Sequence, residues 1–144
     1  MNVKQVSIFL EHVPGSLYDV TATLTENDIH IRALSVAEVG GVVLLRLVVD
    51  NVLWTASILK NSGYPATFTE VVMVDIADVE GGLCRVLKVM KDAGVNVEYA
   101  YSLTGKNTLG SGGVIFEVDD TQKAVDALNS NGIKVISQEE LYAL

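Results

Sequence analysis

The feature that most constrains this chain is an internal duplication. Seven pairs of apolar residues recur at a constant offset of 66 positions along the sequence. The pairs are Val6 and Val72, Ile8 and Val74, Leu17 and Leu83, Val20 and Val86, Leu24 and Met90, Ile29 and Val95, and Ile31 and Val97. Because a sequence repeat indicates a repeated structural unit, the 144 residues predict two small domains of one fold, at residues 1–69 and 70–144.

The first half of each unit is typical of a strand, a helix and a hairpin. In the first unit, residues 6–11 alternate between apolar and polar side chains, as a strand with one buried face does. Residues 16–26 then place their apolar side chains on one side of a helix. Residues 29–38 and 42–49 flank two glycines and predict a β-hairpin. Residues 42–49 are apolar at nearly every position, so both faces of that strand are expected to be covered.

The second half of the first unit predicts a helix and a short strand. Asp50 is expected to cap this helix, whose buried stripe would consist of Val52, Ala56 and Leu59. Gly63 is expected to end it. Residues 64–68 then supply an edge strand, since a proline within it cannot donate to a sheet ladder.

The resulting order is strand, helix, strand, strand, helix, strand. A helix that joins parallel strands of one sheet makes a right-handed crossover, and two interlocked crossovers form a ferredoxin-like sandwich. In such a sandwich both helices cover one face of a four-stranded antiparallel sheet. We therefore predict an α+β fold class with two tandem ferredoxin-like βαββαβ sandwiches.

The second unit repeats this order with one insertion. Its expected strands are residues 71–77, 95–103, 114–118 and 133–136, and its expected helices are residues 83–91 and 121–129. Asp50 and Gly63 recur as Asp119 and Gly132 at an offset of 69, so three residues have been inserted in the connection 104–113. A polar tail, residues 137–142, is expected to add a helical turn.

Composition limits the partners of the chain. A net charge of −8 opposes binding to the phosphate backbone of nucleic acids and to anionic membrane surfaces. The longest apolar stretch is far short of the roughly 20 residues that a membrane-spanning helix requires. We therefore expect no nucleic acid and no membrane partner. With one cysteine, Cys84, no internal disulfide can form, so we expect a cytoplasmic protein.

Residues that could carry catalysis are few. Cys84 lies beside apolar helix positions and is predicted to be a small packing residue, since no base accompanies it. His12 and His30 are the only histidines, and without a nearby cluster of cysteine or glutamate they are a poor metal set. The sequence therefore predicts a protein that is not an enzyme and that has no cofactor and no metal ion.

The turns between the first strand and first helix of each unit carry a family resemblance. Residues 13–17 read Val-Pro-Gly-Ser-Leu and residues 27–31 read Asn-Asp-Ile-His-Ile, whereas residues 79–83 read Val-Glu-Gly-Gly-Leu and residues 93–97 read Ala-Gly-Val-Asn-Val. The sequence resembles the ACT domain family, whose βαββαβ unit has a Pro-Gly-Leu-like turn and a Gly/Asp-Ile-Asn-Ile-like second strand. The resemblance covers almost the whole chain in two copies.

The resemblance implies a function. ACT domains typically bind amino acids or similar small metabolites between two domains, near the strand-to-helix turn, and regulate an attached or associated activity. It implies here an amino acid ligand, a homodimer and a regulated protein partner. The ligand-binding residues that it implies are Glu11, His12, Val13, Pro14, Gly15, Ser16, Leu17, Ile29, Ile31, Asp78, Val79, Glu80, Gly81, Gly82, Leu83, Asn96 and Val97.

The chemistry of the turns agrees with this implication. Backbone N–H groups at a helix N-terminus are unpaired and carry partial positive charge, so a carboxylate can dock there. Glu80 would compete with that carboxylate, so the first turn is the expected carboxylate site. The second turn would receive the amino group or only start a helix. The alternative is a structural adaptor whose turns are empty and whose apolar sheet faces drive assembly.

Overall fold

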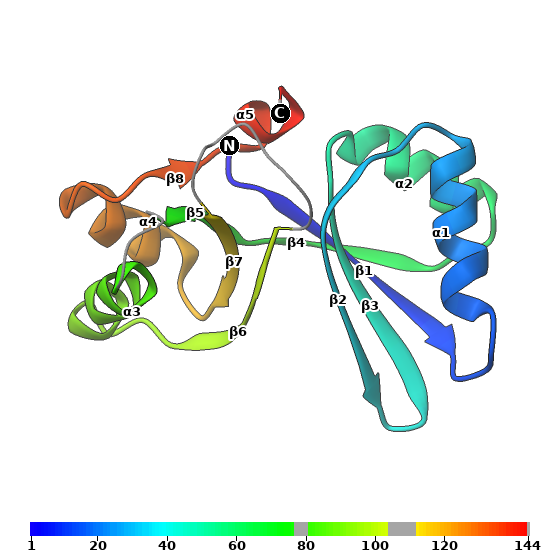
Figure 1. Cartoon of the computed structure of the whole chain (residues 1–144), viewed down its shortest axis with the longest axis horizontal. Coiled ribbons are helices and arrows are strands. Elements are labelled where there is room, and N and C mark those ends of the chain that lie inside the picture. The colour runs from blue at the N-terminus through cyan, green and yellow to red at the C-terminus, as the bar shows by residue number, and fades with distance from the viewer. Residues whose placement is uncertain (77–80, 104–111, 144) are drawn as a thin grey trace. The chain divides into compact units, whose positions relative to one another are not determined.

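The computed structural model describes residues 1–76, 81–103 and 112–143 of the chain. Its first half contains two helices and four strands in the predicted order. They are β1 (Lys4–Glu11), α1 (Ser16–Glu26), β2 (Ile31–Val39), β3 (Val42–Val49), α2 (Val52–Asn61) and β4 (Ala66–Glu70). The strands form one sheet in the order β2-β3-β1-β4, and both helices cover one face of it (Figure 1).

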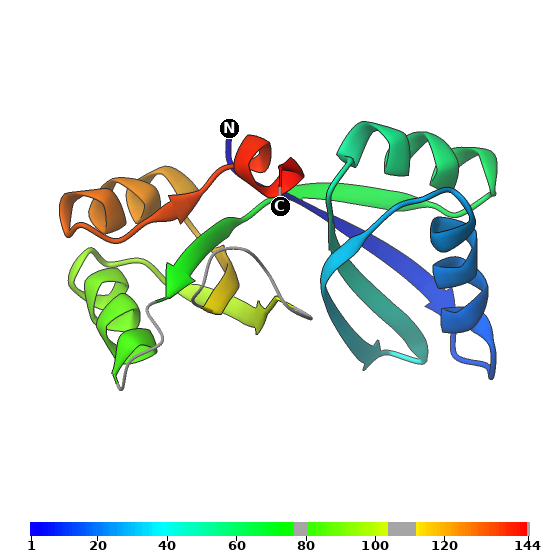
Figure 2. The same ribbon diagram turned by 45° about the horizontal axis from the view of Figure 1, so that its top comes forward.

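The second half repeats this architecture. Its elements are β5 (Val72–Ile76), α3 (Gly82–Asp92), β6 (Val97–Ser102), β7 (Gly112–Val118), α4 (Thr121–Ser130), β8 (Val135–Ile136) and α5 (Gln138–Tyr142). The strand order is β6-β7-β5-β8, with α3 and α4 on one side (Figure 2). The prediction of tandem ferredoxin-like sandwiches is confirmed. Most of the expected insertion, residues 104–111, lies outside the described residues.

The duplication extends to an irregularity in the sheets. The pairing of β2 with β3 shifts register between Ile31 and Ala33, and the pairing of β6 with β7 shifts between Val97 and Tyr99. These two positions are equivalent at the 66-residue offset. Each shift marks a β-bulge, which bends and twists an edge strand.

The chain divides into two compact units, and its first three residues belong to the C-terminal one. Lys4–Thr69 forms the N-terminal unit, and Met1–Val3 belongs with residues 70 onward in the C-terminal unit. Asn2 makes an antiparallel bridge with Ser137, and the Val71 N–H donates to the Val3 carbonyl over 2.9 Å. Val3 is fully buried, so the start of the chain completes the packing of the C-terminal unit.

Each unit has its own apolar core between helices and sheet. The core of the N-terminal unit contains Val6, Ile8, Leu10, Val20, Leu24, Ile29, Val43, Leu45, Leu47, Val49, Ile58 and Leu59. The core of the C-terminal unit contains Val72, Val74, Val86, Met90, Val95, Phe116, Val118, Ala124, Leu128 and Ile133. On β3 the alternate residues Leu44 and Val48 are buried as well, as the apolar run of that strand predicted.

Two details of α2 differ from expectation. Its buried residues are Thr55, Ile58 and Leu59, whereas Ala56 is only half-buried; positions 55, 58 and 59 share one helix face, and 56 lies beside it. The predicted cap is also wrong by one residue, because the side chain of Asn51 accepts the Trp54 N–H over 3.0 Å. Asp50 Oδ1 instead accepts the His30 N–H over 3.2 Å.

All four long helices end in the same way. A residue with positive φ follows each helix, and the next N–H bonds to the carbonyl five residues earlier, as in a Schellman motif. The positive-φ residues are Asp28 (58°), Gly63 (79°), Gly94 (74°) and Gly132 (70°). The closing bonds are Ile29 to Leu24 at 3.1 Å and Tyr64 to Leu59, Val95 to Met90 and Ile133 to Leu128 at 2.9 Å. The predicted role of Gly63 is confirmed.

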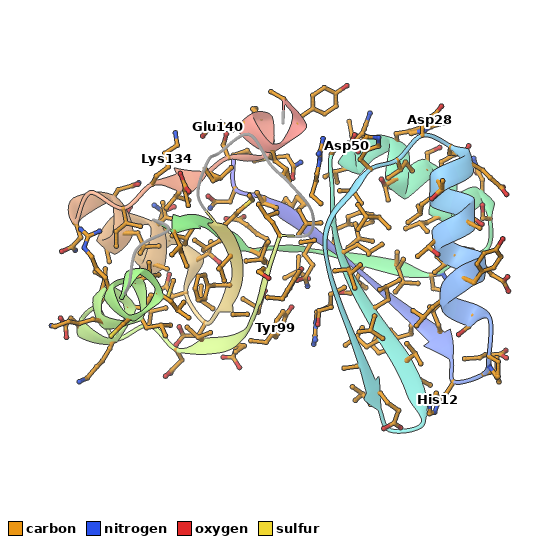
Figure 3. All side chains as sticks on the ribbon, viewed as in Figure 1. His12, Asp28, Asp50, Tyr99, Lys134 and Glu140 are labelled. Carbon is orange, nitrogen blue, oxygen red and sulfur yellow. The ribbon has the colours of Figure 1, made fainter. Side chains whose placement is uncertain are left out.

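The C-terminal helix α5 is held by polar contacts. Ser137 and Glu140 form a capping box, and Lys134 Nζ lies 2.8 Å from Glu140 Oε2, as the labelled pair in Figure 3 shows. The hydrogen bonds from Lys134 and from the Ser137 N–H hold the pKa of Glu140 below its ordinary value of 4.5. None of the helices in the described ranges has the length and apolar character that crossing a membrane demands.

Asp28 and Gly94 provide a matched test of the helix ends. A left-handed conformation costs a residue with a β-carbon about 1–2 kcal/mol. Glycine avoids this cost, but its extra chain entropy in the unfolded state offsets part of the resulting gain in stability. Asp28→Gly should therefore stabilise the chain by roughly 0.5 kcal/mol, and Gly94→Asp should destabilise it by about 1 kcal/mol. Urea denaturation measures both changes; destabilisation by Asp28→Gly would contradict this account.

Glu140 predicts a pH dependence of the α5 docking. Because its folded pKa is lowered, the stabilisation is present above the unfolded pKa and is lost as pH falls through the folded pKa. We expect Leu141, which is fully buried, to lose amide protection as pH falls below the ordinary glutamate pKa of 4.5 and through the lowered one. The loss should be weak and salt-dependent, since the pair is exposed. Hydrogen exchange of Glu140→Gln should lack this pH dependence; an unchanged profile would exclude the ion pair as its cause.

Candidate ligand-binding site

The turn between β1 and α1 is built on a left-handed glycine. Gly15 is the N-cap of α1 with φ 93° and ψ −14°, and its carbonyl accepts the Asp19 N–H over 2.9 Å. A β-carbon at Gly15 would meet no described atom within 4 Å, so this side of the turn is open. Gly81 repeats the arrangement before α3, with φ 85° and a bond of 3.0 Å from the Arg85 N–H.

The Ser16 hydroxyl closes the first turn. Its Oγ lies 2.8 Å from the Glu11 carbonyl and 3.2 Å from the Val13 carbonyl, so its one proton is donated back into the loop. The oxygen keeps its lone pairs for a further donor. Ser16 therefore holds the turn in shape and also presents an acceptor at its surface.

The first turn of α1 leaves backbone donors without a partner. Among the described residues, nothing accepts a hydrogen bond from the N–H groups of Leu17 and Tyr18. Such groups are the unsatisfied donors of a helix N-terminus, and glycine at the N-cap has no side chain to accept from them. The helix dipole adds partial positive charge at the same place, so this end of α1 suits an anionic group.

A pocket of about 310 Å³ adjoins this turn within the N-terminal unit. Four of its lining side chains have polar groups: the carboxylates of Glu11 and Asp19 and the hydroxyls of Ser16 and Tyr64. The remaining lining residues are Phe9, Leu10, Val13, Pro14, Gly63 and Pro65. Its volume falls within the range of small-molecule sites, which are largely apolar with a few polar groups that orient the ligand.

The pocket contains residues that sequence reasoning missed. Asp19 lies in the first turn of α1. Its spacing from Gly15 is about one helical turn, so the sequence could have placed it on the same side of the helix as the glycine turn. The segment 63–65 had no such signal, because it lies far from the turn in sequence. It reaches the pocket because β4, which follows it, is the sheet neighbour of β1.

The structure brings together only some of the predicted site residues. Glu11, Val13, Pro14 and Ser16 line the pocket at the β1–α1 turn, whereas His12 is exposed and does not line it. Leu17 packs against the core.

Two further predicted residues lie elsewhere in the N-terminal unit. Ile29 belongs to the core and Ile31 packs against it. Both line a different pocket of about 370 Å³, which also contains Asp28. Figure 3 labels Asp28 and His12 at opposite ends of α1, so the two pockets lie at opposite ends of that helix.

The predicted residues of the second turn are only partly described. Asp78, Val79 and Glu80 lie outside the described residues, whereas Gly81 and Gly82 start α3 and Leu83 is largely exposed.

On β6, Val97 is also exposed. The N–H of Asn96 donates to Asp119 Oδ1 over 2.9 Å, and its Nδ2 donates to Oδ2 over 3.3 Å. Asn96 therefore holds the start of β6 against the end of β7, as His30 and Asp50 do in the other unit.

The prediction that Cys84 is a packing residue is wrong. Its side chain is exposed, because Val86 and Met90 occupy the buried face of α3 and a residue two positions earlier points away from that face. Among the residues that the structure describes, no three histidine, cysteine or acidic side chains are placed to hold a metal ion.

Comparisons with solved structures agree with this architecture. The chain is similar to protein BT0572 from Bacteroides thetaiotaomicron, with 30% identity and a TM-score of 0.90 over 100% of this chain and 98% of that chain. It shares its fold with the regulatory subunit of aspartate kinase from Thermus thermophilus, with 16% identity and a TM-score of 0.65 over 90% and 93% of the two chains. The corresponding subunit from Thermus flavus has 14% identity and a TM-score of 0.60 over 90% and 92%.

A search of curated proteins finds no match to the sequence. A family model described as an ACT domain pair matches residues 1–144. Because that model spans the entire sequence, the chain belongs to the ACT domain pair family.

Proposed function

We propose that this protein is a regulatory module that binds a free amino acid in the pocket at the β1–α1 turn. The observation that carries the proposal is the combination of groups at that pocket. Two N–H groups in the first turn of α1, those of Leu17 and Tyr18, have no acceptor among the described residues. Ser16 and Asp19 of the same turn line the pocket, as does Glu11, so carboxylates and helix N–H groups come close together there. An amino acid is a zwitterion and needs both kinds of group.

The two charged ends of the ligand would be recognised differently. Its carboxylate would accept hydrogen bonds from the helix N–H groups, which have no acceptor among the described residues and carry partial positive charge. Its ammonium would donate to Asp19 and Glu11 by charge-assisted hydrogen bonds. Gly15 precedes this turn and has open space where a side chain would lie, although it does not itself line the pocket.

A regulatory role needs binding to be coupled to a change that another protein senses. Ligand binding shifts an equilibrium only if it favours one arrangement over another. The similarity to proteins named as regulatory subunits of aspartate kinase supports a role in regulation. We propose a homodimer that acts on a protein partner and that carries out no catalysis of its own.

Asp19 tests the amino acid site. Loss of a charged hydrogen-bond partner costs about 1.5–3 kcal/mol, so Asp19→Asn should weaken binding of the preferred amino acid at least about tenfold. Glu26→Gln, at the other end of the same exposed helix face, is the control and should bind normally. Isothermal titration against the twenty amino acids provides the measurement.

The outcomes of that titration separate the possibilities. Binding that Asp19→Asn weakens and Glu26→Gln leaves unchanged would support the pocket. If no amino acid bound, the proposed function would be wrong; if Asp19→Asn bound as well as the parent, the ligand would lie elsewhere.

The competing function is a structural adaptor, and one observation favours it. On the edge strand β2, Leu34, Val36 and Val39 are 43%, 45% and 51% exposed. An edge strand with exposed apolar residues is a surface that other chains can pair with. Self-association through this edge would need no ligand.

Sedimentation distinguishes the sensor from the adaptor. We expect Leu34→Glu to weaken self-association, because a charge would replace an apolar contact at the β2 edge. Asn129→Glu on α4, also exposed, is the matched control for added charge. A sensor should change its sedimentation when the bound amino acid is added, whereas an oligomer that is indifferent to all amino acids would favour the adaptor.

A further inference from the structure

A second pocket adjoins the proposed amino acid site within the N-terminal unit. It has a volume of about 500 Å³ and lies between α2 and the start of β4. Its walls include Ala56, Leu59, Tyr64, Pro65 and Phe68, and Lys60 is the one charged residue among those that line it. Its walls are therefore predominantly apolar, with two aromatic rings.

The two pockets share one wall. Gly63, Tyr64 and Pro65 line both of them. A ligand bound at the β1–α1 turn therefore lies next to the second pocket. The residues that suit charged ends belong to the first pocket, and the apolar walls extend into the second.

The apolar walls are incompletely covered by the protein itself. Phe68 is 39% exposed, and Tyr64 and Ala56 are half-buried. A small-molecule site is typically a concave, mostly apolar surface of this kind with a few polar groups at one part of it. An aromatic or aliphatic side chain placed here would remove apolar surface from water on both sides.

We propose that the site selects amino acids with a large apolar side chain, phenylalanine-like or leucine-like, and that this side chain occupies the second pocket. The inference rests on the proposed function, since the first pocket must hold the charged ends. Small side chains leave the second pocket empty. Cationic side chains meet Lys60, which lines the second pocket, and acidic ones meet Glu11 and Asp19, which line the first.

Ala56 provides a way to fill the second pocket without touching the first. It lines only the second of these two pockets and does not belong to the core, so Ala56→Met should narrow the pocket while the fold is kept. Ser57→Met, on the next and exposed helix position, adds the same side chain outside the pocket. The pair separates a pocket effect from an effect on the helix.

Calorimetric titration of the full chain with phenylalanine, leucine, alanine, aspartate and lysine tests the proposal. We expect phenylalanine and leucine to bind at least about tenfold more tightly than alanine, because apolar pockets discriminate by about this much for each missing group. Ala56→Met should remove most of that preference and leave alanine binding unchanged, and Ser57→Met should keep it. Phe68→Ser should also weaken the binding of phenylalanine, as Ala56→Met does.

The results of this titration test the side-chain assignment and the amino acid site separately. Alanine binding as tightly as phenylalanine, or Ala56→Met binding phenylalanine as well as the parent, would overturn the side-chain assignment but not the amino acid site. Binding of none of the five, nor of any other amino acid, would overturn the proposed function itself. Circular dichroism of each variant confirms that a loss of binding is not a loss of folding.

Discussion

The constraint on which each unit depends is the reversal of the chain at both ends of every helix. Two helices can cover one face of a four-stranded sheet only if the chain turns back sharply between helix and strand. Residues with positive φ make most of these turns, whereas α2 and α4 begin at the extended residues Asn51 and Asp120. Gly15 and Gly81 begin the first helices, and Asp28, Gly63, Gly94 and Gly132 follow the helix ends. At the entry of α1 this solution leaves backbone N–H groups without a side-chain cap. The same backbone geometry that permits the fold therefore creates a place where an anion can bind.

The two units use one frame with different residues. Asp50 and Asp119 each accept an N–H at the start of the second strand, and Asn51 and Asp120 each cap the following helix. Away from this frame the copies diverge. Trp54 donates its indole N–H to the Asn27 carbonyl over 2.9 Å at the end of α1, whereas Lys123 occupies the equivalent position beside Gly94. Conserved backbone contacts with different surface side chains allow the units to share a fold without sharing a ligand.

A ligand in the proposed site would touch three segments of the N-terminal unit. They are the end of β1, the first turn of α1 and the connection from α2 to β4. Helix termini and loops open with a lower free energy than core strands do. Binding would therefore order these segments further, and such ordering can couple one binding event to another without a large structural change. That is a physical route from an amino acid to a change that a partner could sense.

The duplicated fold could be predicted from the amino-acid sequence alone, because hydrophobic periodicity and glycine positions are local properties that the backbone must follow. The sequence also indicated the β1–α1 turn, four of whose predicted residues line a pocket. The remaining features of the site depend on how distant segments pack together. Sheet order places Tyr64 and Pro65 beside Glu11, although they are far apart in sequence. The orientation of α2 about its axis places Ala56 in a pocket wall and not in the core, and that of α3 places Cys84 at the surface. Periodicity predicts which residues share a face, but packing against the other elements decides which part of that face is buried.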